Sequence, residues 1–190
     1  MNMKINPEPL GRSGRIAALI MLLGLISIWV FAFYAYSTLP ERVPVHFGTG
    51  GDPTRYGEKS EFILIALSFS IAPILILLVA RYRFVLINRY PYLVNLPAFY
   101  TNIHRLHESR RAYWVNRYFE AVLWLGTALT LYLVALEYTI YLSQIQGRIS
   151  GWALLIAILF PVFMLFPFLY MIFRISWEMS DEAGKDAGNY

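Results

Sequence analysis

The chain contains no cysteine and only 3 histidines in 190 residues. The lack of cysteine excludes disulfides, iron–sulfur clusters, thiolate zinc sites and cysteine nucleophiles. All three histidines lie outside the long apolar segments, so none is placed to ligate a haem within a membrane span. No serine or threonine has a histidine at a spacing typical of a nucleophile and its base. We therefore expect a protein that is not an enzyme and carries no cofactor.

Charge is scarce as well, and hydrophobic residues fill its place. Only 15% of the residues are charged, 58% are hydrophobic, and the mean hydropathy is +0.51, which is typical of an integral membrane protein. Four segments are long and apolar enough to cross a bilayer core of about 30 Å. They lie near residues 16–36, 62–80, 118–142 and 152–173. The first is too long for a signal peptide and has no obvious cleavage site after it. The sequence thus predicts an all-α fold, a membrane four-helix bundle forming one domain over residues 1–190.

The distribution of lysine and arginine predicts the orientation of these spans. Twelve of the 16 basic residues lie before the first span, between the second and third, or after the fourth. Cytoplasmic segments carry the excess of basic residues, so both termini are expected inside the cell and the protein in the plasma membrane. The loop at 37–61 then faces outward, together with the short turn at 143–151. The connection at 81–117 and an acidic C-terminal tail at 178–190 face the cytoplasm.

The cytoplasmic connection predicts a structure of its own. Four apolar residues recur at helical spacing after Pro97, where a helix can begin: Phe99, Ile103, Leu106 and Tyr113. We expect an amphipathic helix lying in the plane of the membrane interface. Its basic residues would contact anionic lipid head groups, or alternatively a cytosolic protein partner; they are Arg105, Arg110 and Arg111.

One short motif in this connection could suggest a metal site. His104, His107 and Glu108 fall on one side of a helix, but their order matches neither metalloprotease motif, in which the glutamate has a fixed position as base. The third histidine, His46, is expected on the opposite side of the membrane. We therefore expect no bound metal.

The outward loop contains a polar island of 21 residues from Pro40 to Ser60, rich in glycine and proline. A phosphate-binding loop is excluded, because Gly51 and Gly57 are wrongly spaced and Lys59 follows Glu58 instead of a glycine. We expect an extended stretch over 43–47, a tight turn over 48–51, and a second turn over 52–54 that leads into the next helix.

The side chains of the island allow two interpretations. In the first, they recognise an external ligand; in the second, they pair with one another and hold the loop together. Either way the residues that matter are expected to be Pro44, His46, Gly51, Asp52, Arg55 and Lys59.

These residues also carry a resemblance to a known family. The ordered pattern consists of Leu39, Pro40, Val43, Pro44, His46 and Phe47, followed by Gly51, Asp52, Arg55, Tyr56, Gly57 and Lys59. It resembles a membrane domain of unknown function, number 1648, over roughly residues 20 to 80. In many bacterial proteins that domain precedes the module of the sporulation-delaying-toxin immunity family. The resemblance implies a small membrane protein with a role in immunity, signalling or transport, and it marks His46, Gly51 and Lys59. Immunity-type members commonly carry more spans than the two that follow here.

A last signal lies inside the third span. Glu137 is an ionisable residue near lipid depth, where such residues face a bundle interior or a polar cavity, and Tyr132, Tyr138 and Tyr141 are near enough in sequence to solvate it.

We expect a binding, sensing or immunity-type module that uses its outer loop. The alternatives are an accessory subunit of a larger assembly and a transporter or channel component. The expected partners are the bilayer and a membrane or extracellular protein or peptide, with homo- or hetero-oligomers open and no nucleic acid.

Overall fold

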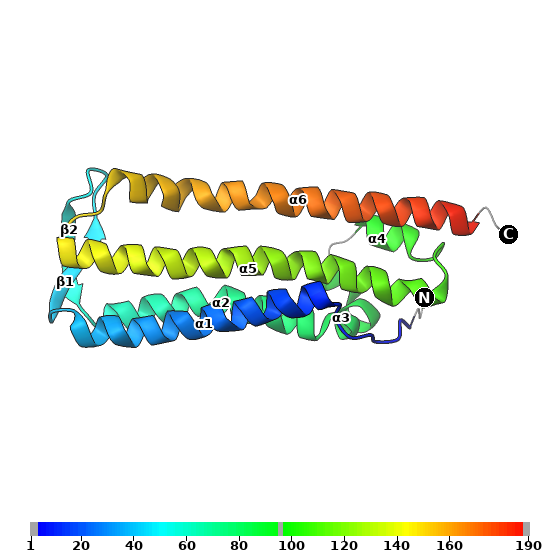
Figure 1. Ribbon diagram of the computed structural model, residues 1–190, viewed down its shortest axis with the longest axis horizontal. Helices are drawn as coiled ribbons and strands as arrows, with labels where there is room; N and C mark the ends of the chain where they lie inside the picture. The colour runs from blue at the N-terminus through cyan, green and yellow to red at the C-terminus, as the bar shows by residue number, and fades with distance from the viewer. Residues whose placement is uncertain (1–3, 95–96, 188–190) are drawn as a thin grey trace. The chain divides into compact units, whose positions relative to one another are not determined.

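A computed structural model describes residues 4–94 and 97–187 of the chain. Within them the chain forms six α-helices, one 3₁₀ turn and a two-stranded sheet (Figure 1). In order these are α1 (Arg12–Thr38), β1 (Arg42–Phe47), β2 (Pro53–Glu58), α2 (Glu61–Arg81), α3 (Arg83–Arg89), η1 (Pro91–Leu93), α4 (Pro97–Asn102), α5 (Glu108–Gln146) and α6 (Gly151–Ala187). Residues 188–190 of the expected tail lie outside the described residues.

Four of these helices, α1, α2, α5 and α6, are long and apolar enough to cross a membrane. Each predicted span lies inside one of them, so the chain is a multi-pass, predominantly helical membrane protein, as expected. The windows that qualify α1 and α2 carry a mean hydropathy of 2.7 and 2.9, and these helices stay continuous because lipid offers the backbone no other hydrogen-bond partners.

The chain divides into two compact units. The first contains Met1–Ala18, Leu75–Leu125 and Phe166–Tyr190, and the second contains Leu19–Ile74 and Gly126–Leu165. In the first unit the core joins residues of α3, α4, α5 and α6. In the second unit it joins residues of α1, β1, α2 and α5.

The first unit corrects the prediction of one interfacial amphipathic helix. A helix does begin at Pro97, but it ends at Asn102, and α5 begins at Glu108. Phe99, Ile103 and Leu106 are buried in the core of this unit, so their apolar sides pack against protein instead of lipid. The same core contains three buried residues of α6 that follow one another at four-residue spacing and so lie on one side of that helix: Ile175, Met179 and Ala183.

The expected acidic tail is helical as far as it is described, because α6 continues to Ala187. Two ion pairs at i,i+4 spacing support the helix: Arg174 with Glu178 at 2.7 Å and Lys185 with Asp181 at 2.6 Å.

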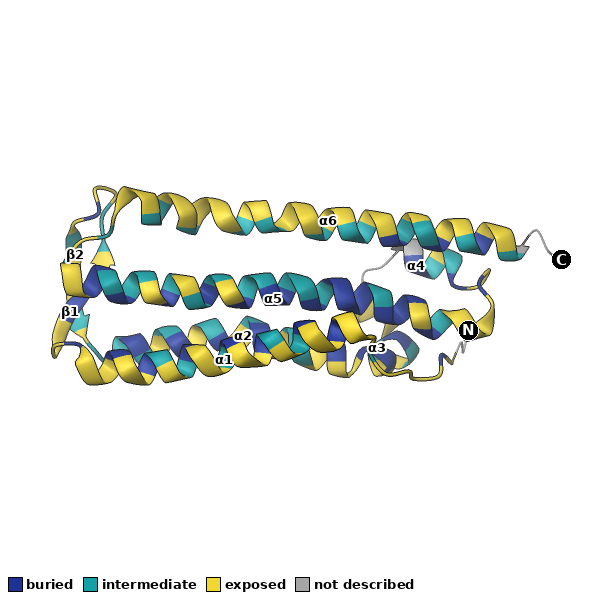
Figure 2. Cartoon of the chain, viewed as in Figure 1, coloured by how far each residue is buried: buried dark blue, intermediate teal, exposed yellow. Residues whose placement is uncertain are grey.

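In the second unit, small residues of α1 allow close packing. The buried stripe of α1 contains Ile28, Ala32 and Ala35. At Gly24 a Cβ atom would lie 2.6 Å from Thr130 Cγ2 of α5, so the two helices approach as closely as a glycine permits. The most apolar window of α6 has no buried residue, and Figure 2 shows the first part of this helix in yellow and teal, which suits contact with lipid.

Candidate functional site

The polar island folds into a β-hairpin. β1 and β2 pair antiparallel, with Arg42 opposite Glu58 and Pro44 opposite Tyr56. The expected extended stretch over 43–47 is confirmed, but the second turn over 52–54 is wrong, since β2 begins at Pro53 and returns along β1. Pro44 is buried at the centre of this pairing.

The tight turn that connects the two strands requires a glycine at one position. The Gly51 N–H donates to the Gly48 carbonyl and the Gly48 N–H to the Asp52 carbonyl, both at 2.9 Å. Gly51 has a φ of +84°, in the left-handed region that favours glycine. The predicted turn over 48–51 is therefore confirmed.

A latch joins the hairpin turn to the connection between α5 and α6. Ile149 N–H donates to the Gly51 carbonyl at 2.9 Å, and Arg148 lies 3.7 Å from the Asp52 carboxylate. A Cβ at Gly51 would overlap the Ile149 carbonyl oxygen. Glycine at this position thus serves both the turn and the close approach, and sequence reasoning had missed this contact because its partners are about a hundred residues apart.

Most charged groups of the hairpin are paired within the second unit. Lys59 lies 2.8 Å from the Glu41 carboxylate and its ammonium is 5.0 Å from the centre of the Tyr36 ring. The hydrogen bond to Glu41 raises the pKa of Lys59. Arg55 pairs with Glu61 at 3.2 Å. These contacts favour a loop-structuring role for Lys59 and Asp52.

Several side chains nevertheless remain exposed on the hairpin, among them the acidic Asp52 and Glu58. His46 Nδ1 is 2.6 Å from Thr54 Oγ1 but stays exposed, and Arg42, Arg55 and Tyr56 are exposed as well. In the strand register Arg42 and His46 flank Pro44, with Tyr56 opposite Pro44 and Arg55 opposite His46. We call Arg42, His46, Arg55 and Tyr56 the hairpin face. Its guanidinium groups and aromatic ring are suited to a carboxylate or a phosphate.

Sequence reasoning did not select Arg42 or Tyr56. Their place becomes visible only once β2 is known to pair back on β1, which puts Arg42 opposite Glu58 and Tyr56 opposite Pro44.

Glu137 is fully buried in the second unit, and neither carboxylate oxygen has a hydrogen-bond partner within the described residues. The tyrosines expected to solvate it bond elsewhere or face outward. The Tyr132 hydroxyl donates to the Ala157 carbonyl, Tyr141 shares a hydrogen bond with Thr38, and Tyr138 is 51% exposed. That expectation was therefore wrong.

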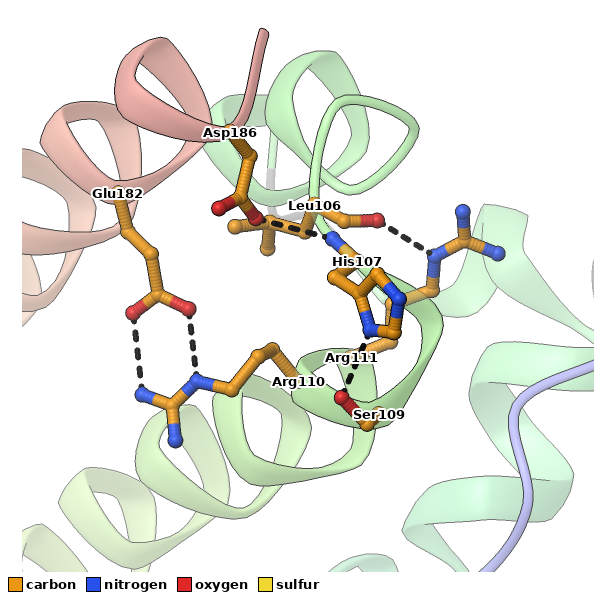
Figure 3. Close-up of polar contacts among 7 residues, drawn as sticks. All are labelled: Leu106, His107, Ser109, Arg110, Arg111, Glu182 and Asp186. Atoms are coloured by element: carbon orange, nitrogen blue, oxygen red, sulfur yellow. Dashed lines mark hydrogen bonds and ion pairs between the residues drawn. The ribbon is translucent and has the colours of Figure 1, made fainter. Parts of the chain in front are cut away.

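The arginines expected to contact lipid or a partner lie in the first unit (Figure 3). Arg110 forms two hydrogen bonds with Glu182, at 2.7 and 3.0 Å, and Arg111 donates to the Leu106 carbonyl at 3.3 Å. Arg105 is exposed at the edge of an open hollow of about 650 Å³. Asp186 of α6 also accepts a hydrogen bond from the His107 N–H, so this end of α6 is tied to the start of α5.

The two histidines of this region show no metal-site geometry. His104 and His107 line the same hollow as Arg105 and Arg111, and His107 Nδ1 lies 2.8 Å from the Ser109 hydroxyl. Across residues 4–94 and 97–187, no group of three His, Asp or Glu side chains is arranged to hold a metal.

Comparison with known proteins supports the resemblance carried by the island. A family described as domain of unknown function (DUF1648) matches residues 22–77, which cover most of α1, the hairpin and most of α2. An uncharacterised protein of Archaeoglobus fulgidus is 42% identical over 183 residues, covering 96% of this chain and 100% of that protein. No solved structure matches the chain. The chain belongs to the family of membrane proteins that carry this domain of unknown function, DUF1648.

Proposed function

We propose that the protein is a non-enzymatic binding or sensing module of the plasma membrane. Its hairpin face would recognise an external ligand that carries a carboxylate or phosphate group. One observation supports this proposal above the others: Arg42, Arg55 and Tyr56 stay exposed on the hairpin, and Arg42 forms no ion pair within the described residues. Arg55 is exposed although it also pairs with Glu61. An immunity-type role would be the case in which the ligand is a peptide toxin.

The hairpin is suited to this role because it is rigid before it binds. The turn hydrogen bonds, the Lys59–Glu41 pair and the latch to Ile149 all restrict its backbone. A preformed surface loses less conformational entropy on binding than a flexible loop would. The latch also gives the hairpin a direct connection to the turn between α5 and α6, through which an occupied hairpin would affect these helices.

The test uses a defined anionic probe, a fluorescent hexaglutamate peptide, added to protein in nanodiscs. We expect binding that weakens about tenfold in the Arg42→Gln/Tyr56→Ala variant, because about 1.4 kcal/mol corresponds to tenfold in affinity. Arg12→Gln is the charge-matched control, because Arg12 is exposed and lies in α1, outside both the hairpin and its latch. Equal binding by the double variant and the native protein would refute the proposal for peptide carboxylates, and a phosphorylated peptide repeats the test for phosphate.

A second candidate function, proton or ion transport, rests on Glu137. Buried ionisable residues within spans commonly mark ion pathways, and this carboxylate has no partner among the described residues. Flux into liposomes that disappears in Glu137→Gln would support transport. Absence of flux with the native protein would rule out the transport function.

A third candidate, an accessory subunit, rests on the exposed apolar face of α6. Extraction in mild detergent followed by mass measurement distinguishes a constant complex from a lone chain, and a lone chain would exclude this role.

A further inference from the structure

In the first unit, an amphipathic groove lies between the N-terminal segment, residues 4–10, and helix α3. Two adjoining hollows of about 660 and 560 Å³ form it, and they share Pro7, Phe84 and Val85 as lining residues. We propose that this groove binds one anionic phospholipid. Basic residues on its rim would hold the phosphate, and Val85 and Tyr82 would contact an acyl chain.

The rim of the groove carries exposed cations. Lys4, Arg15, Arg81 and Arg89 line the two hollows and are exposed. Within the described residues none of these four forms an ion pair, in contrast to the paired Arg110. The lining residues also include one acid, Glu8, so a net excess of positive charge remains for a phosphate.

Hydrogen bonds fix the walls of the groove before any ligand enters. Asn88 of α3 accepts from the Ile5 N–H and donates to the Ile5 carbonyl, both at 2.9 Å. The buried Arg83 donates to the Glu8 carbonyl at 2.6 Å and to the Asn116 side chain at 2.7 Å. These bonds hold the N-terminal segment against α3, so the groove is preorganised.

The apolar part of the groove favours a lipid over a free phosphate. Tyr82 and Val85 are 53% and 42% exposed. Tyr82 directly follows Arg81, where the candidate span α2 ends, and Val85 lies in α3 just beyond it. A position with cations beside exposed apolar groups at the end of a span suits the headgroup region of a bilayer, where anionic lipids attract basic residues. A free phosphate would leave these apolar groups in water.

The experiment counts bound molecules by native mass spectrometry of the full chain in non-ionic detergent. The protein is titrated with phosphatidylglycerol, phosphatidylcholine or glycerol 3-phosphate. We expect one phosphatidylglycerol to bind at least about tenfold more tightly than phosphatidylcholine, and glycerol 3-phosphate not to be retained. Equal binding of the two lipids, or tight binding of glycerol 3-phosphate, would overturn the proposal.

Variants separate this groove from diffuse attraction by basic residues. Lys4→Gln/Arg89→Gln should weaken phosphatidylglycerol binding at least about tenfold, and Val85→Asn should weaken it with no change of charge. Arg12→Gln/Arg105→Gln is the control, because it removes the same charge from exposed residues that do not line the groove. Equal weakening in the control would show a general electrostatic effect and refute the groove. The outcome is independent of the hairpin.

Discussion

The Tyr132 hydroxyl of α5 donates a hydrogen bond of 2.7 Å to the Ala157 carbonyl of α6. This carbonyl would normally accept from the N–H four residues later, but that residue is Pro161, which has no N–H. The rings of Tyr132 and Phe160 also stack, with centroids 5.2 Å apart. In lipid no water could replace the missing donor, so Tyr132 satisfies the backbone group that the proline leaves free.

Tyr132→Phe should therefore destabilise the protein by about 1–2 kcal/mol while keeping the stacked ring. The measurement is reversible unfolding in mixed detergent micelles. The penalty should shrink when Pro161→Ala is added, because alanine restores the N–H donor to the Ala157 carbonyl. Tyr138→Phe is the control, since Tyr138 is 51% exposed. A penalty that is the same with and without Pro161 would contradict this explanation.

Gly24 and Thr130 make a second prediction about packing in the second unit. Gly24→Ala should cost about 1–3 kcal/mol, because the new Cβ would lie 2.6 Å from Thr130 Cγ2. Adding Thr130→Ser removes that methyl group and keeps a hydroxyl for the bond to the Gly126 carbonyl, so it should restore most of the loss. Unfolding of the two single variants and the double variant gives the coupling.

Gly184→Ala serves as the control for this pair, because nothing lies within 4 Å of the added Cβ. Alanine within α6 should stabilise the protein by about 0.5–1 kcal/mol through its helix propensity. If both glycine variants behaved alike, close packing at Gly24 would not be the cause.

Substitution of the two glycines with positive φ distinguishes the cost of backbone strain from the cost of losing the latch. Gly147 has a φ of +65° and no atom within 4 Å of an added Cβ, whereas Gly51 has a φ of +84° and faces the Ile149 carbonyl. Gly147→Ala should cost about 1 kcal/mol from strain alone. Gly51→Ala should cost more and should also open the hairpin to hydrogen exchange at residues 48–54. Equal exchange in both variants would argue against the latch.

Hydropathy was enough to predict the four long helices, because about 20 apolar residues in a row have few other structures available. The hairpin shows where this information ends. Residues 53–58 contain proline, glycine and charges without apolar alternation, so β2 gave no strand signal. It forms because β1, which is fixed by Val43 in the core of the second unit, offers it a partner.

The prediction for the basic connection at 81–117 was wrong for a different physical reason. The spacing of Phe99, Ile103 and Leu106 does indicate one apolar face, but the sequence alone cannot say whether lipid or protein covers it. The covering residues, Ile175 and Met179, lie about 70 positions away, one just before and one within the acidic tail expected at 178–190. Likewise, the pairing of Arg110 with Glu182 depends on this distant packing.

Glu137 is the residue where stability and function should oppose each other. Its carboxylate is fully buried, and neither oxygen has a partner among the described residues, an arrangement that costs free energy. Glu137→Met keeps a similar volume and removes the polar atoms, so it should stabilise the protein by about 1–3 kcal/mol in detergent unfolding. Thr139→Val is the control, because Thr139 is only half-buried on α5 and should change the stability by no more than about 0.5 kcal/mol. A loss of stability in Glu137→Met would mean that the carboxylate is satisfied in the membrane by a group outside this chain, such as water or an ion.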